Sequence, residues 1–300
     1  MGSSLVAIPD AHARGRLGWG VEALQTKALE VRRDILTLLP GAGSGHTGGP
    51  LSIADFGTVL FFYEMALDPR HPKWEGRDFW HFSCGHVTPV IYSLMAERGY
   101  FPLKDLLGFR QFHGHLQGHP SAHDTPGIEV SSGSLGQGLS VCVGVALASR
   151  LDQSRRRVYA VLSDGEQQEG STWEAVLCAA HYKLDNLCAV MDYNNIQIDG
   201  KVEKIMGLAP LADKYRAFNW HVIEMDGHDV PALVDAFAEA RRTKGKPTLI
   251  LAHTLMGMPI SFMKDDYRWH GKPPKMDEAE KALAELGTTY DEWKQRLLNG

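Results

Sequence analysis

The sequence predicts an α/β fold in which helices cover both faces of one doubly wound parallel sheet. Short apolar runs recur along its second half, and segments with the apolar spacing of helices lie between them. Strands that are apolar on both sides belong to parallel sheets covered on both faces. No internal repeat, low-complexity run or linker divides the 300 residues, so we expect a single domain over residues 1–300.

The first half of the chain is predicted to be mainly helical. Its first helix has apolar residues at helical spacing and ends at Pro40-Gly41, a common stop signal. Its second helix has almost no charge and is therefore expected to be buried on most sides. We predict helices at residues 21–39, 51–65, 86–98 and 101–112, and a short aromatic strand at residues 79–82.

The second half is predicted to alternate between strands and helices. It follows a long segment rich in histidine, glycine, serine and proline, residues 113–138, and a loop of that length in a compact domain usually has a function. The basic run at residues 155–157 is expected to face solvent. We predict helices at residues 136–151, 171–183 and 230–243, and strands at residues 158–162, 187–191, 221–225 and 248–252.

The composition argues against several classes of protein. A net charge of −5 argues against a nucleic-acid partner, because proteins that bind phosphate backbones usually carry a basic excess. No apolar run reaches the ~18 residues of a membrane span, and Asp10, His12 and Arg14 stand where a signal peptide needs apolar residues. The four cysteines form no Cys-x-x-Cys pair and are expected to be reduced. We therefore expect a cytoplasmic protein that binds no membrane.

Two predicted strands end in oxygen-rich loops. Asp164 and Gly165 follow the first strand in "VLSDGEQQEG", and Asn194 follows the next in "AVMDYNNIQIDG". The carboxyl ends of parallel strands share one edge, where ligands bind. Carboxylate, amide and carbonyl oxygens suit Mg²⁺ or Ca²⁺ and leave positions for phosphate oxygens. An Asp-Gly pair can also simply form a turn. The second loop, one strand–helix–strand unit further on, favours a metal site.

These two loops together resemble the thiamine diphosphate and metal-binding motif. Five further motifs, "SGHTGG", "SCGHVTPVIYSL", "LQGHP", "SSGSLGQGLS" and "WHGKPP", follow the order found in transketolases. The sequence is similar, from about Leu24 to Pro274, to the amino-terminal part of a transketolase and to the first subunit of a split, two-chain transketolase. The resemblance implies the thiamine diphosphate-binding fold, with the pyrimidine-binding domain on a separate carboxy-terminal chain.

The resemblance also implies roles for individual residues. The metal, Mg²⁺ with Ca²⁺ or Mn²⁺ as alternatives, would be held by Asp164, the Asn194 side chain and the Ile196 carbonyl. His46 and His119 would bond the sugar's hydroxyl groups and move protons, which suits the ordinary pKa of histidine. His86 and His270 would lie on the diphosphate side, His270 also near the substrate, and Glu169 matches the acid that links two active sites across the dimer. The catalytic set is His46, His119, His270 and Glu169, and the cofactor-binding set is His86, Gly133, Ser134, Leu135, Gly165, Asn194 and His270.

The implied function is transfer of a two-carbon ketol unit from a ketose, or ketose phosphate, to an aldose. The partner would be a separate carboxy-terminal subunit in an α2β2 assembly, acting in the pentose phosphate part of carbohydrate metabolism. Alternatives are the first subunit of a 1-deoxyxylulose-phosphate synthase-like enzyme or of a 2-oxo-acid dehydrogenase, a non-catalytic cofactor-binding module, and a zinc hydrolase built on His113, His115, His119 and His123. "LQGHP", "WHGKPP" and the retained histidines favour transketolase.

Four residues depart from the family's pattern. Thr47 stands where proline is usual, and Ser163 replaces the first glycine of the usual Gly-Asp-Gly. Neither change is expected to disturb the site. Met256 and Met258 stand where basic residues near the diphosphate are common. If Met256 faces the cofactor, a lysine in its place should tighten binding, because an ammonium attracts a diphosphate and a thioether does not.

Overall fold

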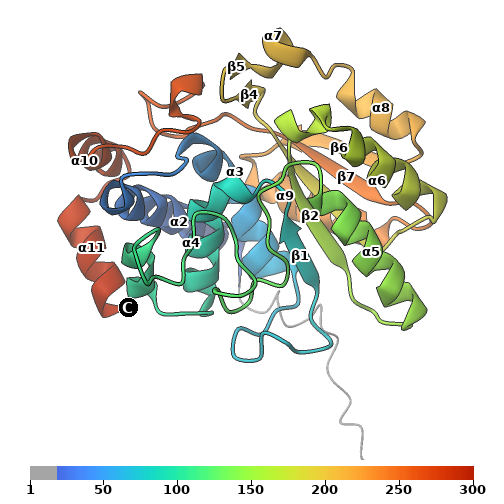
Figure 1. Ribbon diagram of the computed structural model, residues 1–300, viewed down its shortest axis with the longest axis horizontal. Coiled ribbons are helices and arrows are strands. Elements are labelled where there is room, and N and C mark those ends of the chain that lie inside the picture. Colours follow the sequence, from blue (N-terminus) through green and yellow to red (C-terminus); the bar gives the residue numbers. More distant parts are fainter. Residues whose placement is uncertain (1–18) are drawn as a thin grey trace, which may run out of the picture.

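The computed structural model describes residues 19–300, which form a parallel sheet between two layers of helices (Figure 1). All neighbouring strands of the five-stranded sheet are parallel, in the order β1-β2-β3-β7-β6. Each predicted strand is present, within two residues of its predicted ends. The strands are β1 (Phe79–Phe82), β2 (Val158–Ser163), β3 (Leu187–Tyr193), β6 (His221–Asp226) and β7 (Thr248–His253).

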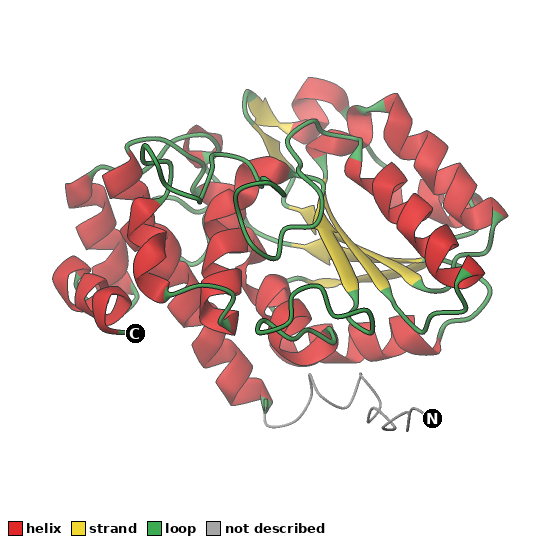
Figure 2. Cartoon of the chain, turned by 60° about the horizontal axis from the view of Figure 1, so that its bottom comes forward, coloured by secondary structure: helices red, strands yellow, loops and turns green. Residues whose placement is uncertain are grey.

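The strands are apolar on both sides because each side contacts its own helical layer. On β2, Tyr159 and Val161 face one core, whereas Val158, Ala160 and Leu162 face the other. Figure 2 shows the strands side by side with helices around them. One layer contains α2 (Val21–Ala42), α3 (Gly48–Thr58), α4 (Thr88–Arg98) and α9 (Val230–Arg242), and the other contains α5 (Gly138–Leu151), α6 (Gly170–His181) and α8 (Leu211–Ala217). The doubly wound prediction is confirmed.

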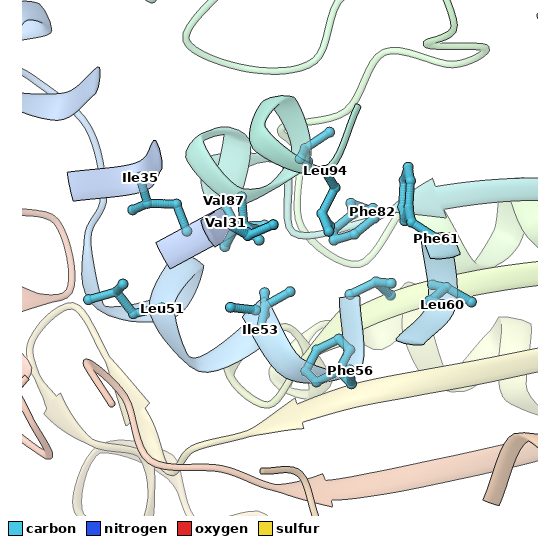
Figure 3. Close-up of a cluster of buried hydrophobic side chains, with 14 of the residues drawn as sticks. Val31, Ile35, Leu51, Ile53, Phe56, Leu60, Phe61, Phe82, Val87 and Leu94 are labelled. Carbon is cyan, nitrogen blue, oxygen red and sulfur yellow. The ribbon is translucent and has the colours of Figure 1, made fainter. Parts of the chain in front are cut away.

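Helix α3 is the centre of the larger core. Every residue of α3 is buried, as its lack of charge predicts, and Ile53 and Phe56 pack among side chains of α2, α4 and β1 (Figure 3). The helix continues as a short π-helix, η1 (Val59–Glu64). Because α3 begins at Gly48, this rigid element fixes the end of the glycine-rich loop that carries His46.

Two predicted helices have different ends in the structure. Helix α2 continues through Pro40 and ends at Gly43, whose left-handed φ of 61° lets its N–H bond to the Leu39 carbonyl. Proline in the last turn costs one backbone bond and does not end the helix there. The helix predicted at residues 101–112 is only a 3-10 turn, η3 (Leu103–Gly108).

Several short elements were not predicted. They include two helices that follow the last strand and pack on α2. None of the described helices is long and apolar enough to cross a membrane. These elements are η4 (Gly165–Gln168), the hairpin β4 (Ile196–Gln197) and β5 (Gly200–Lys201), α7 (Val202–Met206), α8, η5 (Tyr267–Trp269), α10 (Met276–Glu285) and α11 (Tyr290–Asn299). The helix predicted from residue 86 begins as a 3-10 turn, η2 (Gly85–Val87).

One expectation about charge was wrong. Arg157, from the basic run expected to face solvent, is buried. Its guanidinium donates to the carbonyls of Asp185 and Ala240, at 3.4 Å and 3.3 Å. An arginine whose donors bond to backbone carbonyls can be buried at the start of a strand, and residue type alone does not reveal those partners.

Candidate active site

A cavity of about 380 Å³ lies at the carboxyl edge of the sheet. Its walls come from the loops after α2, β1, β2 and β3, from the long loop before α5, and from the segment at η5. All but one of the residues that the sequence assigned to the site line it. They are His46, His86, His119, Gly133, Leu135, Asp164, Gly165, Glu169, Asn194, Ile196 and His270, whereas Ser134 does not line the cavity.

Asp164 joins the two oxygen-rich loops. Its Oδ1 accepts a hydrogen bond from the Gly165 N–H at 2.7 Å, and its Oδ2 accepts one from the Asn195 N–H at 2.5 Å. The side chain is buried at the end of β2, and burial together with the nearby Asp192 carboxyl raises its pKa to about 8. The carboxyl is therefore held in place by backbone donors, and no cationic side chain of residues 19–300 contributes to lowering its pKa.

Asn194 is oriented by a second buried acid, Asp192. The Asn194 Nδ2 donates to Asp192 Oδ2 at 2.7 Å, and its Oδ1 accepts from the Ile196 N–H at 2.9 Å. Asp192 also accepts from the hydroxyls of Ser52, at 2.8 Å, and Thr254, and burial raises its pKa. Asp192 was not assigned a role from the sequence, although an acid near the end of an apolar strand was a usable signal.

These groups fit a divalent cation. Asp164 and Asp192 place two buried carboxyls at one end of the cavity, and no lysine or arginine of the described chain lines it. Buried carboxylates need a counter-charge. Asp164 oxygen, Asn194 amide oxygen and the Ile196 carbonyl are the hard ligands that Mg²⁺ and Ca²⁺ prefer. A histidine or cysteine cluster is not required here.

The zinc alternative was wrong. Within residues 19–300, no group of three histidine, cysteine or acidic side chains could hold a metal ion. The four histidines of the long loop have different surroundings. His115 contacts Asp105 at 3.1 Å, His123 contacts Asp124 at 3.0 Å, His119 lines the cavity, and His113 is exposed with a left-handed φ of 63°.

Two glycines allow close approach within the site. Gly133, with a left-handed φ of 154°, lies so close to His119 that a Cβ would be 3.1 Å from the ring. Gly136, with a φ of 82°, would place a Cβ 2.5 Å from that of Glu169. Any other residue would strain the backbone or displace these side chains. The loop "SSGSLGQG" therefore sets the positions of His119 and Glu169.

Three imidazoles meet in the wall of the cavity. The ring centroids of His46 and His86 lie 4.9 Å apart, those of His86 and His270 5.5 Å, and those of His46 and His270 5.7 Å, and the Nδ1 atoms of His46 and His270 are buried without a hydrogen-bond partner in the described residues. Burial, with smaller contributions from neighbouring histidines and, for His46, from Arg110, lowers the pKa of His46 to about 4 and that of His86 to about 3. Burial also lowers the pKa of His270 and of His119. Neutral rings can both donate and accept protons.

Glu166 holds the loops together and was not assigned a role from the sequence. Its buried carboxyl accepts from the Ser83 hydroxyl, the Gly136 N–H at 3.3 Å and the Ser163 N–H at 3.0 Å. Ser163 also directs its hydroxyl to Glu166, and it is not among the described residues with positive φ. The serine in place of glycine is therefore accommodated, as expected.

The neighbouring departure, Thr47, has a partner of its own. It is buried, and its hydroxyl donates to the Lys272 carbonyl at 2.6 Å. This bond joins the loop of His46 to the segment that follows His270. Proline could not donate such a bond.

The structure places Met256 in the core and not in the lining of the cavity. Met256 is fully buried and packs against Gly48, where a Cβ would be 2.6 Å from the Met256 Cγ. Neither Met256 nor Met258 lines the cavity. The Met258 carbonyl accepts from Arg32 Nε at 3.3 Å. A thioether here fills space beneath the glycine-rich loop, a common use of methionine.

Comparison with known proteins gives strong similarities over most of the chain. The family described as transketolase, thiamine diphosphate binding domain, matches residues 30–295. A 6-deoxy-6-sulfo-D-fructose transketolase subunit of a Clostridium species is 40% identical over 263 residues, which are 88% of this chain and 96% of that protein. An apulose-4-phosphate transketolase subunit of Actinobacillus succinogenes is 41% identical over 266 residues, again 88% of this chain and 96% of that protein.

The solved structures show the same fold. The crystal structure of a transketolase from Campylobacter jejuni superposes with a TM-score of 0.86 at 31% identity, over 93% of this chain and 46% of that one. The chain thus spans nearly the whole length of the subunit relatives and about half the length of this solved transketolase.

Proposed function

This chain belongs to the transketolase family, which it matches over the thiamine diphosphate-binding domain, and we propose that it forms the diphosphate side of a transketolase active site. The observation that carries the proposal is one cavity lined by buried carboxyls and by neutral imidazoles. The carboxyls suit a metal-bound diphosphate, and the imidazoles suit a hydroxylated sugar.

The buried carboxyl and amide groups would hold the cofactor through a divalent cation, which we propose is Mg²⁺. Asp164, the Asn194 side chain and the Ile196 carbonyl would bind the cation, and Asp192 would keep the Asn194 amide in its orientation. Gly165 leaves open the space in front of it, since a Cβ there would meet nothing closer than 3.6 Å. Thiamine diphosphate, when bound, stabilises the carbanion produced by carbon–carbon cleavage.

The histidines that line the cavity would bind the sugar and accept a proton from it. The rings of His46 and His270 line the cavity, where imidazole nitrogens can bond hydroxyl groups. The hydroxyl that becomes the carbonyl oxygen of the departing aldose must lose its proton as the bond breaks, and we assign its acceptance to His46 or His119. Their lowered pKa values keep both rings unprotonated at neutral pH, so each can accept that proton.

The substrate and partner follow from the relatives and from the charge of the cavity. The similar proteins are named for a phosphorylated and a sulfonated sugar, and the word subunit in their names implies a second chain. No lysine or arginine of residues 19–300 lines the cavity. We therefore expect a separate carboxy-terminal subunit to supply the cations for the sugar's anionic group, in an α2β2 assembly. The family match favours transketolase over the synthase, dehydrogenase and non-catalytic alternatives.

Calorimetric titration with thiamine diphosphate and Mg²⁺ tests this proposal. Asp164→Ala should abolish metal-dependent binding, because the diphosphate loses the cation that neutralises it. Asp199→Ala is the matched control, because Asp199 is an exposed acid on the hairpin β4–β5, which carries Ile196. This variant should bind like the wild type. Equal affinity of the two variants for thiamine diphosphate in Mg²⁺ would show that Asp164 does not bind the metal.

A further inference from the structure

Arg110 joins the two loops that carry His46 and His119. Its Nη1 donates to the Ser44 hydroxyl at 3.3 Å, two residues before His46, and its Nη2 donates to the Gly118 carbonyl at 3.1 Å, one residue before His119. These loops are far apart in the sequence. One planar guanidinium therefore spans the substrate end of the site.

The side chain fits this place closely. A Cβ on Gly118 would lie 3.1 to 3.3 Å from the Nε, Cζ and Nη2 atoms of Arg110, so the guanidinium packs flat against the glycine. The Arg110 backbone has a left-handed φ of 54°, and its N–H donates to the Leu116 carbonyl at 2.9 Å. This turn directs the Arg110 side chain toward the two loops. The close contact of its guanidinium with Gly118 explains the glycine in "LQGHP".

Helix α4 holds the other side of the same loop. The Thr88 hydroxyl donates to the Gly118 carbonyl at 3.1 Å, and the Tyr92 hydroxyl donates to the Gln117 carbonyl at 3.0 Å. Helix α4 thus anchors the loop of His119, and the Arg110 side chain connects this loop to the loop of His46.

The charge of Arg110 has no carboxylate partner among the described ion pairs. It helps to lower the pKa of His119, after burial, and that of His46, after burial and His270. The charged or titratable groups around His46 are His86, His270, Arg110 and His119, and Arg110 is the one permanent cation of this set.

We propose that Arg110 is a positioning residue that holds His46 and His119 at a fixed separation. It acts through the two loops and does not line the cavity. The proposal rests on the proposed function only in taking these two histidines as the sugar-binding pair.

Two measurements on the full chain without cofactor test it: NMR titration of the histidine ring protons, and hydrogen exchange of the backbone amides in residues 44–48 and 117–119. Arg110→Met should raise the measured pKa of His119 by about 0.5 and that of His46 by less, since a nearby cation is lost. It should also speed exchange in both loops together. Arg110→Lys keeps the charge, so the pKa values should stay near wild type while exchange still increases.

Arg150→Met is the matched control, because the Arg150 guanidinium also bonds two acceptors, the backbone carbonyls of Tyr182 and Lys183, but outside the residues that line the cavity. If Arg110→Met does not fold, Gly118→Ala displaces the guanidinium by steric contact and should speed exchange in the same two loops. The proposal is overturned if the Arg110 variants change neither loop nor either pKa more than Arg150→Met does. Because neither readout needs turnover, this failure is distinct from failure of the proposed function.

Discussion

At the scale of single residues, the site combines buried acids and neutral histidines in the wall of one cavity. Asp164 and Asp192 lie where a cation would relieve their burial, and the pKa values of His46 and His86 are lowered to about 4 and 3. The acids thus favour a metal-bound diphosphate, and the rings can exchange protons with hydroxyl groups at neutral pH.

A prediction at this scale concerns Met256, which the structure places in the core. Met256→Lys should destabilise the fold by about 3 kcal/mol or more, because it buries an ammonium without a partner. Urea unfolding of the full chain measures this, and Met258→Lys, at a half-buried position, should cost less. Tighter thiamine diphosphate binding by Met256→Lys at unchanged stability would contradict this prediction and show that residue 256 faces the cofactor.

A second residue, His81, predicts a pH dependence of stability. It is buried on β1, and burial lowers its pKa to about 4. Below pH 6.5 the unfolded chain takes up a proton that the folded chain excludes, so stability is lost as the pH falls from about 6.5 toward 4.

His81→Phe should therefore reduce the loss of unfolding free energy between about pH 7.5 and pH 5 by about 1 to 2 kcal/mol. Denaturant unfolding at both pH values gives this difference. An unchanged pH dependence in His81→Phe would show that His81 takes up its proton at the same pH in the folded and the unfolded chain, which would contradict this prediction.

The sequence was informative about residues whose role depends on a local pattern. Asp164 and Asn194 were predictable because each follows an apolar strand and parallel strands end at one edge. Asp192 offered the same signal near the end of its strand and was missed, whereas Glu166 could not be assigned because its partner Ser83 comes from a distant segment. The place of Met256 likewise depends on its packing against Gly48 in three dimensions.

At the scale of elements, apolar runs identified the strands of the large sheet. Strands β1, β2, β3 and β7 are buried along most of their length, whereas the edge strand β6 is only partly buried. The hairpin β4–β5 has only two residues in each strand, too few for any periodicity. It nonetheless belongs to the site, because Ile196 and Gln197, which line the cavity, come from it. Gln168 fixes it by donating to the Gln197 Oε1 at 2.7 Å.

Helix α11 depends on one buried hydrogen bond. Trp293 Nε1 donates to Asp34 Oδ1 at 2.8 Å, and Asp34, on α2, is fully buried. Trp293→Phe should lower the unfolding free energy by about 1 to 3 kcal/mol, because the buried carboxyl loses a donor. Tyr290→Phe on the same helix is the control and should have little effect. Equal stability of the two variants would show that water replaces the indole.

At the scale of the whole molecule, the chain carries its site at one edge of the sheet. The metal-side groups and the histidines come from this chain, whereas no lysine or arginine that could bind a sugar's phosphate or sulfonate lines the cavity in residues 19–300. Relatives of similar length are named as subunits, and the solved transketolase is about twice as long. Both facts support a site completed by a second chain.

The most direct test of this account is ketol transfer by the purified chain, by a carboxy-terminal transketolase subunit, and by their mixture, each with thiamine diphosphate and Mg²⁺. Phosphorylated and sulfonated ketoses serve as donors, and the product ketose is measured. We predict turnover by the mixture alone, and its loss when Asp164→Ala replaces the wild-type chain. Turnover by this chain alone, or undiminished turnover with Asp164→Ala, would contradict the account.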